Sequence, residues 1–382
     1  MYDLILIRYG ELVLKGGNRK LFINTLKQNI LKITGEMPEV SFDRMYLTYN
    51  EDNMRRLKFV FGISSFSPVK RVNTNINDIK TEVLNQFNDD LKTFRLNCHR
   101  NWKKFELTSQ EIIKEVASEL FDKKENLKVD LTKFEQQINI EVREKYSYVF
   151  SKNIKGLDGL PVGVSGKALH LISGGIDSPV AAFELMKRGV RVDFLSFITP
   201  PHTDEKTVEK VEKIVQLLAN YQAGAKLFQI NYTDLMNYIG LTSNQSYKIN
   251  LMRRSFYRIA DLLAKKEGYL AISNGENLGQ VASQTMESMD VIGSQTSLQI
   301  YRPLLTFNKI DTIKLAEIIG TYQISIEKAN EACELFAPKN PVIKPTFEHA
   351  NNLELELNEL IPLEKEAISN KMSVKRFKNK LQ

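Results

Sequence analysis

The pattern of hydrophobic and polar positions differs between the two halves of the chain. In the first half, short apolar or alternating runs that favour strands are mixed with segments whose apolar residues recur at helical spacing. Such a mixture is typical of α+β folds, and we predict two small α+β domains over residues 1–65 and 66–160. The predicted strands are 2–8, 42–49, 103–108, 137–143 and 146–151, and the predicted helices are 18–33, 51–59, 76–87 and 109–121.

Predicted strands and helices alternate in the remainder, which we place at residues 161–382. The stretch 155–167, rich in glycine and proline, is the best linker candidate before it. The alternation predicts an α/β domain with a parallel sheet and helices on both faces. We interpret the basic tail after residue 370 as a solvated helix end. The predicted strands are 168–172, 190–198, 225–231 and 269–273, and the predicted helices are 179–188, 204–221, 247–266 and 309–319.

Composition is that of a globular protein. A chain of 382 residues with 42% hydrophobic and 26% charged residues is long enough for two or three domains with ordinary cores. No apolar run approaches the roughly 18 to 20 residues that a membrane span needs, and the start lacks the features of a signal peptide. We therefore expect a cytoplasmic protein without a membrane partner.

Charge and cysteine content limit the partners and the kinds of site that the chain can have. Residues 1–170 contain 28 Lys and Arg against 22 Asp and Glu, so +6 of the net charge of +7 lies there. This asymmetry favours a polyanionic partner, although a solvated basic surface explains it about as well. Two cysteines, Cys98 and Cys333, and four scattered histidines are too few for a disulfide framework or a cysteine-rich zinc or iron–sulfur site.

The most informative segment is LHLISGGIDSPVAAFELMKRGV, which predicts a strand, a loop at 173–178 and a helix with proline in its first turn. Adjacent Gly174 and Gly175 let backbone N–H groups approach an oxyanion, and the helix N-terminus behind them favours phosphate. Ser173 and Ser178 add hydroxyl donors. The segment therefore predicts a phosphate-binding loop.

Asp177 needs a separate explanation because a carboxylate repels phosphate. We interpret it as a catalytic carboxylate on the magnesium side of the α-phosphate, with a helix cap as the alternative. The nearby string GVSGK, residues 163–167, lacks the glycine spacing of a Walker loop. A hydrolase acting on the γ-phosphate is therefore excluded.

The rest of a nucleotide site should lie beyond the carboxyl ends of the strands, where open parallel sheets bind ligands. These ends fall at 171–172, at 196–197 and just before Gly275. Arg253 and Arg254 lie on a predicted helix from which one could reach phosphates, although a solvated helix face explains them equally well.

Four strings, SGGIDSPVA, MRRSFYRIA, GENLGQVASQT and YRPLLTFNK, together resemble the ThiI-type tRNA 4-thiouridine synthetases, which are PP-loop ATP pyrophosphatases. The strings YDLILIRYGELVLKGGNRKLF and FGISSFSPVKR resemble the family's ferredoxin-like domain, and KVDLTKFEQQINIEVREKYSYVF resembles its RNA-binding THUMP domain. The resemblance covers nearly the whole chain. It implies a ferredoxin-like domain, a THUMP domain and a PP-loop domain, in that order.

The activity that the resemblance implies is ATP-dependent tRNA sulfurtransfer. ATP with Mg²⁺ adenylates O4 of the uridine at position 8, in the tRNA elbow, and a persulfide sulfur then displaces AMP to give 4-thiouridine. The family is also linked to sulfur transfer to a carrier protein for the thiazole of thiamine, and we leave that role open. The implied ATP contacts, beyond the loop itself, are Leu171, Ile172, Ser196, Phe197, Arg253, Gly275 and Gln284.

The family's catalytic cysteine matches Cys333 in ANEACELFAPKNP. Ala332 stands where some members have a second cysteine, and the sequence stops too soon for the rhodanese domain that some members carry. We therefore expect a form without that domain, in which a cysteine desulfurase supplies sulfur directly to Cys333. We also expect a homodimer. Cys98 has no counterpart in the resemblance, and we interpret it as structural.

A basic cluster in the first half is the candidate RNA contact. Arg100, Lys103 and Lys104 lie beside Trp102, so cations for a phosphate backbone and an aromatic ring for stacking occur together. Trp102 is as easily explained as a core residue.

Two other functions stay open. Another PP-loop tRNA-modifying ligase would use a nitrogen nucleophile and need no thiol, so indifference to substitution of Cys333 would favour it. A non-catalytic THUMP RNA-binding protein would consume no ATP, and the intact SGGIDS string argues against it.

Overall fold

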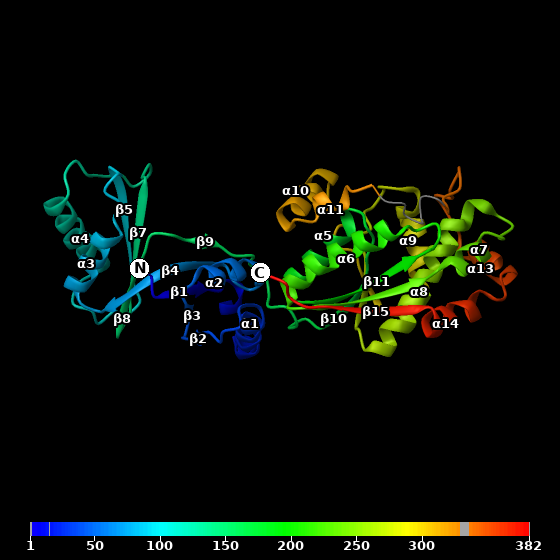
Figure 1. The fold of residues 1–382 in the computed structure, drawn as a ribbon, viewed down its shortest axis with the longest axis horizontal. Coiled ribbons are helices and arrows are strands. Elements are labelled where there is room, and N and C mark those ends of the chain that lie inside the picture. The colour runs from blue at the N-terminus through cyan, green and yellow to red at the C-terminus, as the bar shows by residue number, and fades with distance from the viewer. Residues whose placement is uncertain (1, 15, 329–335, 382) are drawn as a thin grey trace. The chain divides into compact units, whose positions relative to one another are not determined.

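The computed structural model describes residues 2–14, 16–328 and 336–381, and it divides into two compact units, residues 1–159 and 160–382 (Figure 1). The elements of the first unit are β1 (Leu4–Arg8), α1 (Arg19–Thr34), β2 (Glu39–Val40), β3 (Met45–Thr48), α2 (Glu51–Arg56), β4 (Ser65–Asn73), α3 (Ile76–Gln86), β5 (Thr93–Arg100), α4 (Ser109–Lys123), β6 (Lys128–Val129), β7 (Gln136–Val142), β8 (Tyr146–Phe150) and β9 (Ile154–Lys155).

One sheet of mixed direction runs through the first unit in the order β2-β3-β1-β4-β8-β7-β5-β6, with β9 paired to β4. The long strand β4 connects its two parts: residues 65–69 pair with β1, and residues 70–73 pair with β8. Helices α3 and α4 lie side by side on β5, β7 and β8 (Figure 1), and their apolar faces form a core with those strands. The boundary predicted at residue 65 falls at the start of β4, the strand that both parts share, and it stays a prediction.

The predicted strand at 103–108 is wrong. The strand of this region is β5, and residues 101–108 form turns and bends that lead into α4. Residues 103–108 alternate between polar and apolar like a strand because Phe105 packs into the core from a loop, while its neighbours Lys104 and Glu106 are exposed. In β5, Phe94 and Leu96 are buried, but the polar residues that follow them, Asn97, His99 and Arg100, hid the strand.

The second unit contains β10 (Lys167–Leu171), α5 (Asp177–Lys187), β11 (Arg191–Ile198), α6 (Glu205–Ala219), β12 (Ala225–Asn231), α7 (Thr233–Ile239), α8 (Lys248–Glu267), β13 (Ala271–Ser273), α9 (Met286–Gly293), β14 (Gln299–Tyr301), α10 (Lys309–Ile319), α11 (Tyr322–Ser325), α13 (Phe347–Glu356), α14 (Leu360–Asn370) and β15 (Met372–Phe377).

The sheet of the second unit has the order β14-β13-β10-β11-β12-β15. Strands β10 to β14 pair in parallel, as the alternation of strands and helices predicts. Helices α5 and α6 cover one face, and α7, α8 and α14 cover the other (Figure 1). The fold class predicted from the sequence, α+β domains followed by an α/β domain with helices on both faces, is confirmed.

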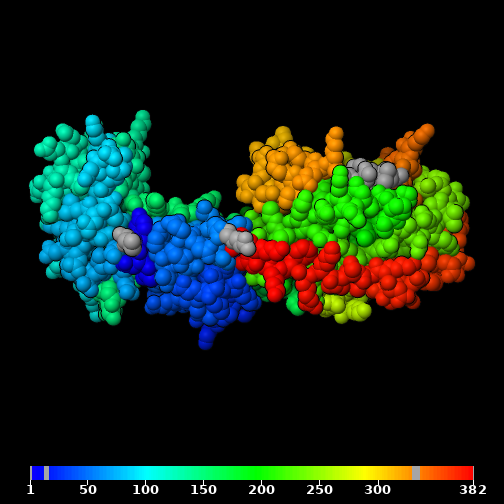
Figure 2. All heavy atoms as spheres, viewed as in Figure 1, coloured from blue at the N-terminus to red at the C-terminus, as the bar shows by residue number. Residues whose placement is uncertain are grey.

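The tail is a strand rather than the predicted solvated helix end. β15 pairs antiparallel with β12, so the sheet is mixed at this edge, and the strand lies at the molecular surface, where Figure 2 shows it in red. Its basic residues, including Lys375, are exposed side chains of an edge strand. Charge on an edge strand discourages pairing with another sheet, which explains why the segment carries no strand-like apolar pattern. Among the described residues, no helix is long and apolar enough to cross a membrane.

Candidate nucleotide-binding and active site

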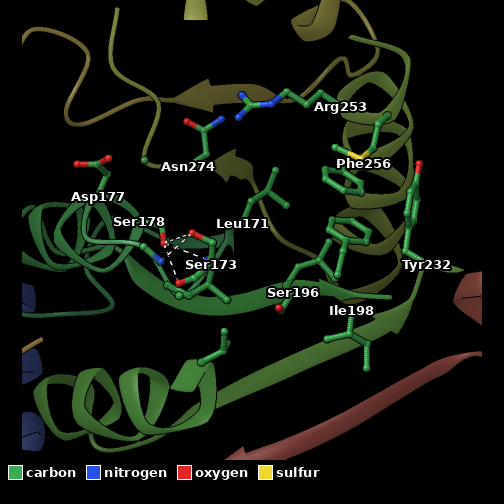
Figure 3. Close-up of a pocket in the computed structure, with 18 of the residues that line it drawn as sticks. Leu171, Ser173, Asp177, Ser178, Ser196, Ile198, Tyr232, Arg253, Phe256 and Asn274 are labelled. Atoms are coloured by element: carbon green, nitrogen blue, oxygen red, sulfur yellow. Dashed lines mark hydrogen bonds between the residues drawn. The ribbon is translucent and has the colours of Figure 1, made fainter. Parts of the chain in front are cut away.

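A cavity of about 240 Å³ opens at the carboxyl ends of β10, β11 and β13 (Figure 3). This is the edge at which parallel α/β sheets hold their ligands. Every position that the sequence placed in a nucleotide site lines the cavity: Leu171, Ile172, Ser173, Gly174, Gly175, Asp177, Ser178, Ser196, Phe197, Arg253, Gly275 and Gln284.

The loop between β10 and α5 is held in a compact shape by its two serines. The hydroxyl of Ser178 donates to the carbonyl of Ser173 at 3.2 Å and accepts from the backbone N–H of Ser173 at 3.0 Å. Figure 3 shows the two side chains facing one another at the cavity floor. Because α5 begins at Asp177, its N-terminal N–H groups and positive dipole end lie at this loop, which suits a phosphate group.

Gly275 lets the chain after β13 approach the start of α5 closely. A Cβ atom at this position would lie only 2.6 Å from the backbone nitrogen of Ser178 and 2.8 Å from the carbonyl carbon of Asp177. Both atoms belong to backbone that cannot move aside without displacing the helix. Glycine is therefore required here by packing, and the close approach fixes one wall of the cavity against the phosphate loop.

Asp177 lies at the cavity rim and does not cap its helix. Its two carboxylate oxygens accept from the ammonium of Lys309 at 2.7 and 2.8 Å, and Gln280 donates to one of them at 2.9 Å. No side-chain hydrogen bond caps α5, whose N-cap residue is Ile176. The capping alternative for Asp177 therefore finds no support in the geometry. Sequence reasoning missed Lys309 as a site residue, although it stands in the string YRPLLTFNK.

A buried carboxylate, Glu276, fixes Arg253 at the opposite side of the cavity. It accepts from Arg253 at 2.7 Å, from Arg302 at 2.7 Å and from the hydroxyl of Tyr257 at 3.3 Å. Burial and the neighbouring carboxylate raise the pKa of Tyr257, so its hydroxyl stays protonated and donates. Arg253 extends from α8 toward Asn274 (Figure 3), which places a cation on the cavity wall.

The neighbouring Arg254 points the other way. Its side chain is 1% exposed and makes two hydrogen bonds to Glu354 of α13, at 2.9 and 2.7 Å, and one to Asn351 at 2.6 Å. Of the two arginines, only Arg253 lines the cavity. Arg254 instead ties α8 to the C-terminal helices, since a paired and hydrogen-bonded guanidinium tolerates burial.

Aromatic rings form the wall opposite the loop. Phe197, at the end of β11, stacks on Phe256 of α8 with ring centroids 3.9 Å apart and planes 7° apart, and Tyr232 meets both rings edge-on. Sequence reasoning missed Phe256 and Tyr232. Phe256 follows Arg253 by three positions on one helix, and that spacing was the signal that would have found it. A wall of this kind suits a flat base.

Cys333 lies outside the described residues, so its role stays a prediction. The chain before it is anchored beside the phosphate loop. Ser325 of α11 donates to the carbonyl of Gly175 at 3.3 Å, and buried Lys210 of α6 donates to the carbonyl of Glu327 at 2.9 Å. Ser325 of α11 therefore lies against the phosphate loop.

The basic cluster of the first unit is only partly free to meet RNA. Lys103 and Lys104 are exposed in a turn, whereas Arg100 donates to the carbonyls of Phe105 and Leu107, both at 2.9 Å. Trp102 packs against the core of α3, α4 and the sheet. The two lysines are therefore better placed than Arg100 for contact with phosphates.

Cys98 fits the structural interpretation. It is half-buried on β5 and packs against the core of the first unit. Burial raises the pKa of its thiol to about 11, so the thiolate, which is the nucleophile, is scarce at neutral pH.

Family models match all three parts of the chain. The model described as thiamine biosynthesis protein (ThiI) matches residues 163–358, the ThiI ferredoxin-like domain matches residues 4–67, and the THUMP domain matches residues 73–152. The first of these covers about half of the chain by itself.

Individual relatives match end to end. A probable tRNA sulfurtransferase of Mycoplasmopsis agalactiae is 55% identical over 97% of this chain and 98% of its own length. One of Mycoplasmopsis pulmonis is 54% identical over 98% of this chain and its entire length. A crystal structure of a 4-thiouridine synthetase in complex with RNA and ATP superposes with a TM-score of 0.91, at 33% identity, over 99% of this chain and 100% of that one. The chain therefore belongs to the ThiI family of tRNA sulfurtransferases.

Proposed function

We propose that this chain uses ATP to adenylate O4 of the uridine at position 8 in the tRNA elbow and then replaces that oxygen with sulfur, which gives 4-thiouridine. The observation that carries the proposal is the cavity, in which a phosphate loop faces an aromatic wall and Asp177 and Arg253 lie at its two sides. The relatives support it through their names, and the similar crystal structure contains both RNA and ATP.

Some of the twelve positions of the predicted nucleotide site would bind the base of ATP, and others would bind its phosphates. The stacked rings of Phe197 and Phe256 would take the adenine, and the loop N–H groups with Ser173 would take the phosphates. Uridine O4 would attack the α-phosphorus, and pyrophosphate would leave. Lys309, which pairs with Asp177, would neutralise the negative charge that develops on the phosphates.

Magnesium fits this arrangement only as a companion of ATP. Mg²⁺ is typically held by one or two carboxylates together with substrate phosphates, and Asp177 is the carboxylate beside the loop. Glu276 is already committed to two arginines. Within the described ranges, no group of three or more His, Cys, Asp and Glu could hold a metal without the nucleotide. Bound there, Mg²⁺ would neutralise phosphate charge and orient the α-phosphate.

In the second step, Cys333 would carry the sulfur. The terminal sulfur of a Cys333 persulfide would attack C4 of the adenylated uridine, and AMP would leave with the former O4 on its phosphate. A thiol of an external reductant would then attack the Cys333 sulfur, release 4-thiouridine and leave a mixed disulfide on Cys333, and a second thiol would free the Cys333 thiol as the reductant is oxidised to its disulfide. Five further points stay predictions: persulfide supply by a cysteine desulfurase, sulfur transfer to a thiamine carrier protein, a homodimeric state, a cytoplasmic location, and the domain limits at 65 and 160.

The nature of the ATP cleavage tests the function. With unmodified tRNA, ATP and Mg²⁺, the protein should produce AMP and pyrophosphate in equal amounts, and omission of tRNA should suppress both. Nucleotide chromatography combined with a pyrophosphate assay reads both products. Release of ADP and phosphate instead would contradict the proposal, because it would place cleavage at the γ-phosphate.

The first unit is expected to bind tRNA by itself. Its net charge is positive, it has its own core, and Lys103 and Lys104 are exposed. Because counterions are released on binding, affinity of residues 1–159 for tRNA should fall by about tenfold or more between roughly 50 and 200 mM salt. Fluorescence anisotropy measures this. Alanine at both lysines should flatten the salt dependence, and a folded fragment without salt-sensitive binding would refute the prediction.

A further inference from the structure

One buried titratable side chain of the second unit has no part in the mechanism above. His170 lies on β10, is fully buried, and uses both of its ring nitrogens. Nε2 lies 2.9 Å from the carbonyl oxygen of Ser178, and Nδ1 lies 2.7 Å from the hydroxyl oxygen of Ser273. Because a carbonyl can only accept, Nε2 carries the proton, and Nδ1 accepts from Ser273. Burial lowers the pKa of His170 to about 4, so the ring is neutral.

The two hydrogen bonds join the parts of the fold that build the phosphate end of the cavity. Ser178 lies in the first turn of α5, and its hydroxyl holds Ser173 of the loop. Ser273 ends β13, directly before Asn274 and Gly275 of the cavity wall. The ring therefore lies beneath the point at which those two walls make their closest backbone approach.

Core packing alone does not explain a histidine here. The ring meets Phe194 edge-on, with centroids 6.1 Å apart, and a leucine would fill a similar space without burying two polar nitrogens. Burial of an imidazole is unfavourable unless both nitrogens are satisfied, and here both have partners on segments that line the cavity. Unlike leucine, histidine makes two hydrogen bonds, and these fix the distances from β10 to the start of α5 and to the end of β13.

We propose that His170 is a positioning residue for adenylation, which holds the first turn of α5 and the end of β13 in register so that the phosphate loop meets the α-phosphate correctly. The inference rests on the proposed function, because it concerns the rate of pyrophosphate release. His170 touches neither nucleotide nor tRNA and acts through Ser178 and Ser273. The donor on Nε2 carries most of the effect, since it contacts the helix that follows the loop.

Three substitutions separate the two hydrogen bonds. In His170→Gln, the side-chain amide reaches the position of Nε2 and can still donate to Ser178. In His170→Asn, the shorter amide reaches only the position of Nδ1. His170→Leu makes neither bond. Phe194→Leu is the packing control, because it perturbs the same core and leaves both bonds of His170 intact.

The experiment measures kcat and KM for ATP in tRNA-dependent pyrophosphate release, together with the melting temperature of each variant. We expect His170→Gln to keep most of kcat, and His170→Asn and His170→Leu to lose about 10- to 100-fold, because small misplacements of reacting groups have effects of that size. Phe194→Leu should lower the melting temperature while kcat stays within about threefold of the unsubstituted protein. Ser273→Ala, which removes one buried oxygen, should lower kcat by less than His170→Leu.

Two outcomes would overturn the inference. One is that His170→Leu has the same kcat as the unsubstituted protein. If the leucine variant does not fold, the same result for both Ser273→Ala and His170→Asn counts instead. The other is a fall in kcat that follows the melting temperature in all variants, Phe194→Leu included. If the unsubstituted protein itself releases no pyrophosphate with tRNA, the proposed function fails first, and that result is visible before any variant is compared.

Discussion

Replacement of Asp177 by asparagine is expected to lower tRNA-dependent pyrophosphate release by about 100-fold or more, a loss typical when a charged group that acts on the transition state is removed. The carboxylate is held by Lys309 and Gln280 at the cavity rim. Asparagine has a similar shape, but it cannot pair with Lys309 as an anion or bind Mg²⁺ as strongly. Affinity for tRNA should stay unchanged, because the substitution leaves the first unit untouched.

Pyrophosphate release and tRNA binding must be measured separately to interpret this variant. Asp311→Asn is the matched control: Asp311 is an exposed carboxylate two positions after Lys309, and it does not line the cavity. The control should release pyrophosphate at the rate of the unsubstituted protein. If Asp177→Asn lost tRNA affinity and activity together, a folding role for Asp177 would replace the catalytic one.

Replacement of Cys333 by serine is expected to abolish 4-thiouridine formation while adenylation continues. A serine hydroxyl cannot bear a persulfide, whereas pyrophosphate release needs only the nucleotide site and tRNA. The assay supplies ATP, tRNA, a cysteine desulfurase with cysteine, and a reductant, and it reads 4-thiouridine by its near-ultraviolet absorbance. Pyrophosphate is measured in the same reaction.

Cys98→Ser is the control for this prediction. Its high thiol pKa and its packing against the core argue against a redox role, so thiolation should be largely retained. Normal thiolation by Cys333→Ser would show that the sulfur mechanism is wrong even within the right family. A folded but inactive Cys98→Ser would instead identify Cys98 as a resolving thiol.

The sequence predicted the parts of the fold whose pattern is local. The helix at Lys309–Ile319 and the strand at Ala225–Asn231 have the bounds predicted from the sequence, because the helix ends at Gly320 and the strand is an almost unbroken run of buried residues. Strands β5 and β15 were missed because their outward positions are polar or basic, and only pairing with neighbouring strands makes them regular. Pairing between strands that are distant in sequence, unlike periodicity, produces no clear pattern within a short stretch of sequence.

The candidate site shows the same division. The phosphate loop was predictable because its residues are contiguous and its chemistry depends on the backbone. The contact between Asp177 and Lys309 was not, since 132 positions separate them and only the fold brings α10 to the start of α5. Helical spacing alone did not distinguish Arg253 from Arg254, and only the family resemblance singled out Arg253. Adjacent helical residues differ by about 100° in direction, and which one faces a cavity depends on what packs against the helix.

The nucleoside content of the tRNA tests the central claim most directly. Unmodified tRNA is incubated with the protein, ATP, Mg²⁺, a cysteine desulfurase with cysteine, and a reductant, then digested and analysed by mass spectrometry. We predict 4-thiouridine, mapped to position 8, that is absent when ATP or the protein is omitted. A tRNA that gains a nitrogen-containing modification instead, or that gains no thiolated nucleoside although ATP is cleaved to AMP, would contradict sulfur transfer as the function.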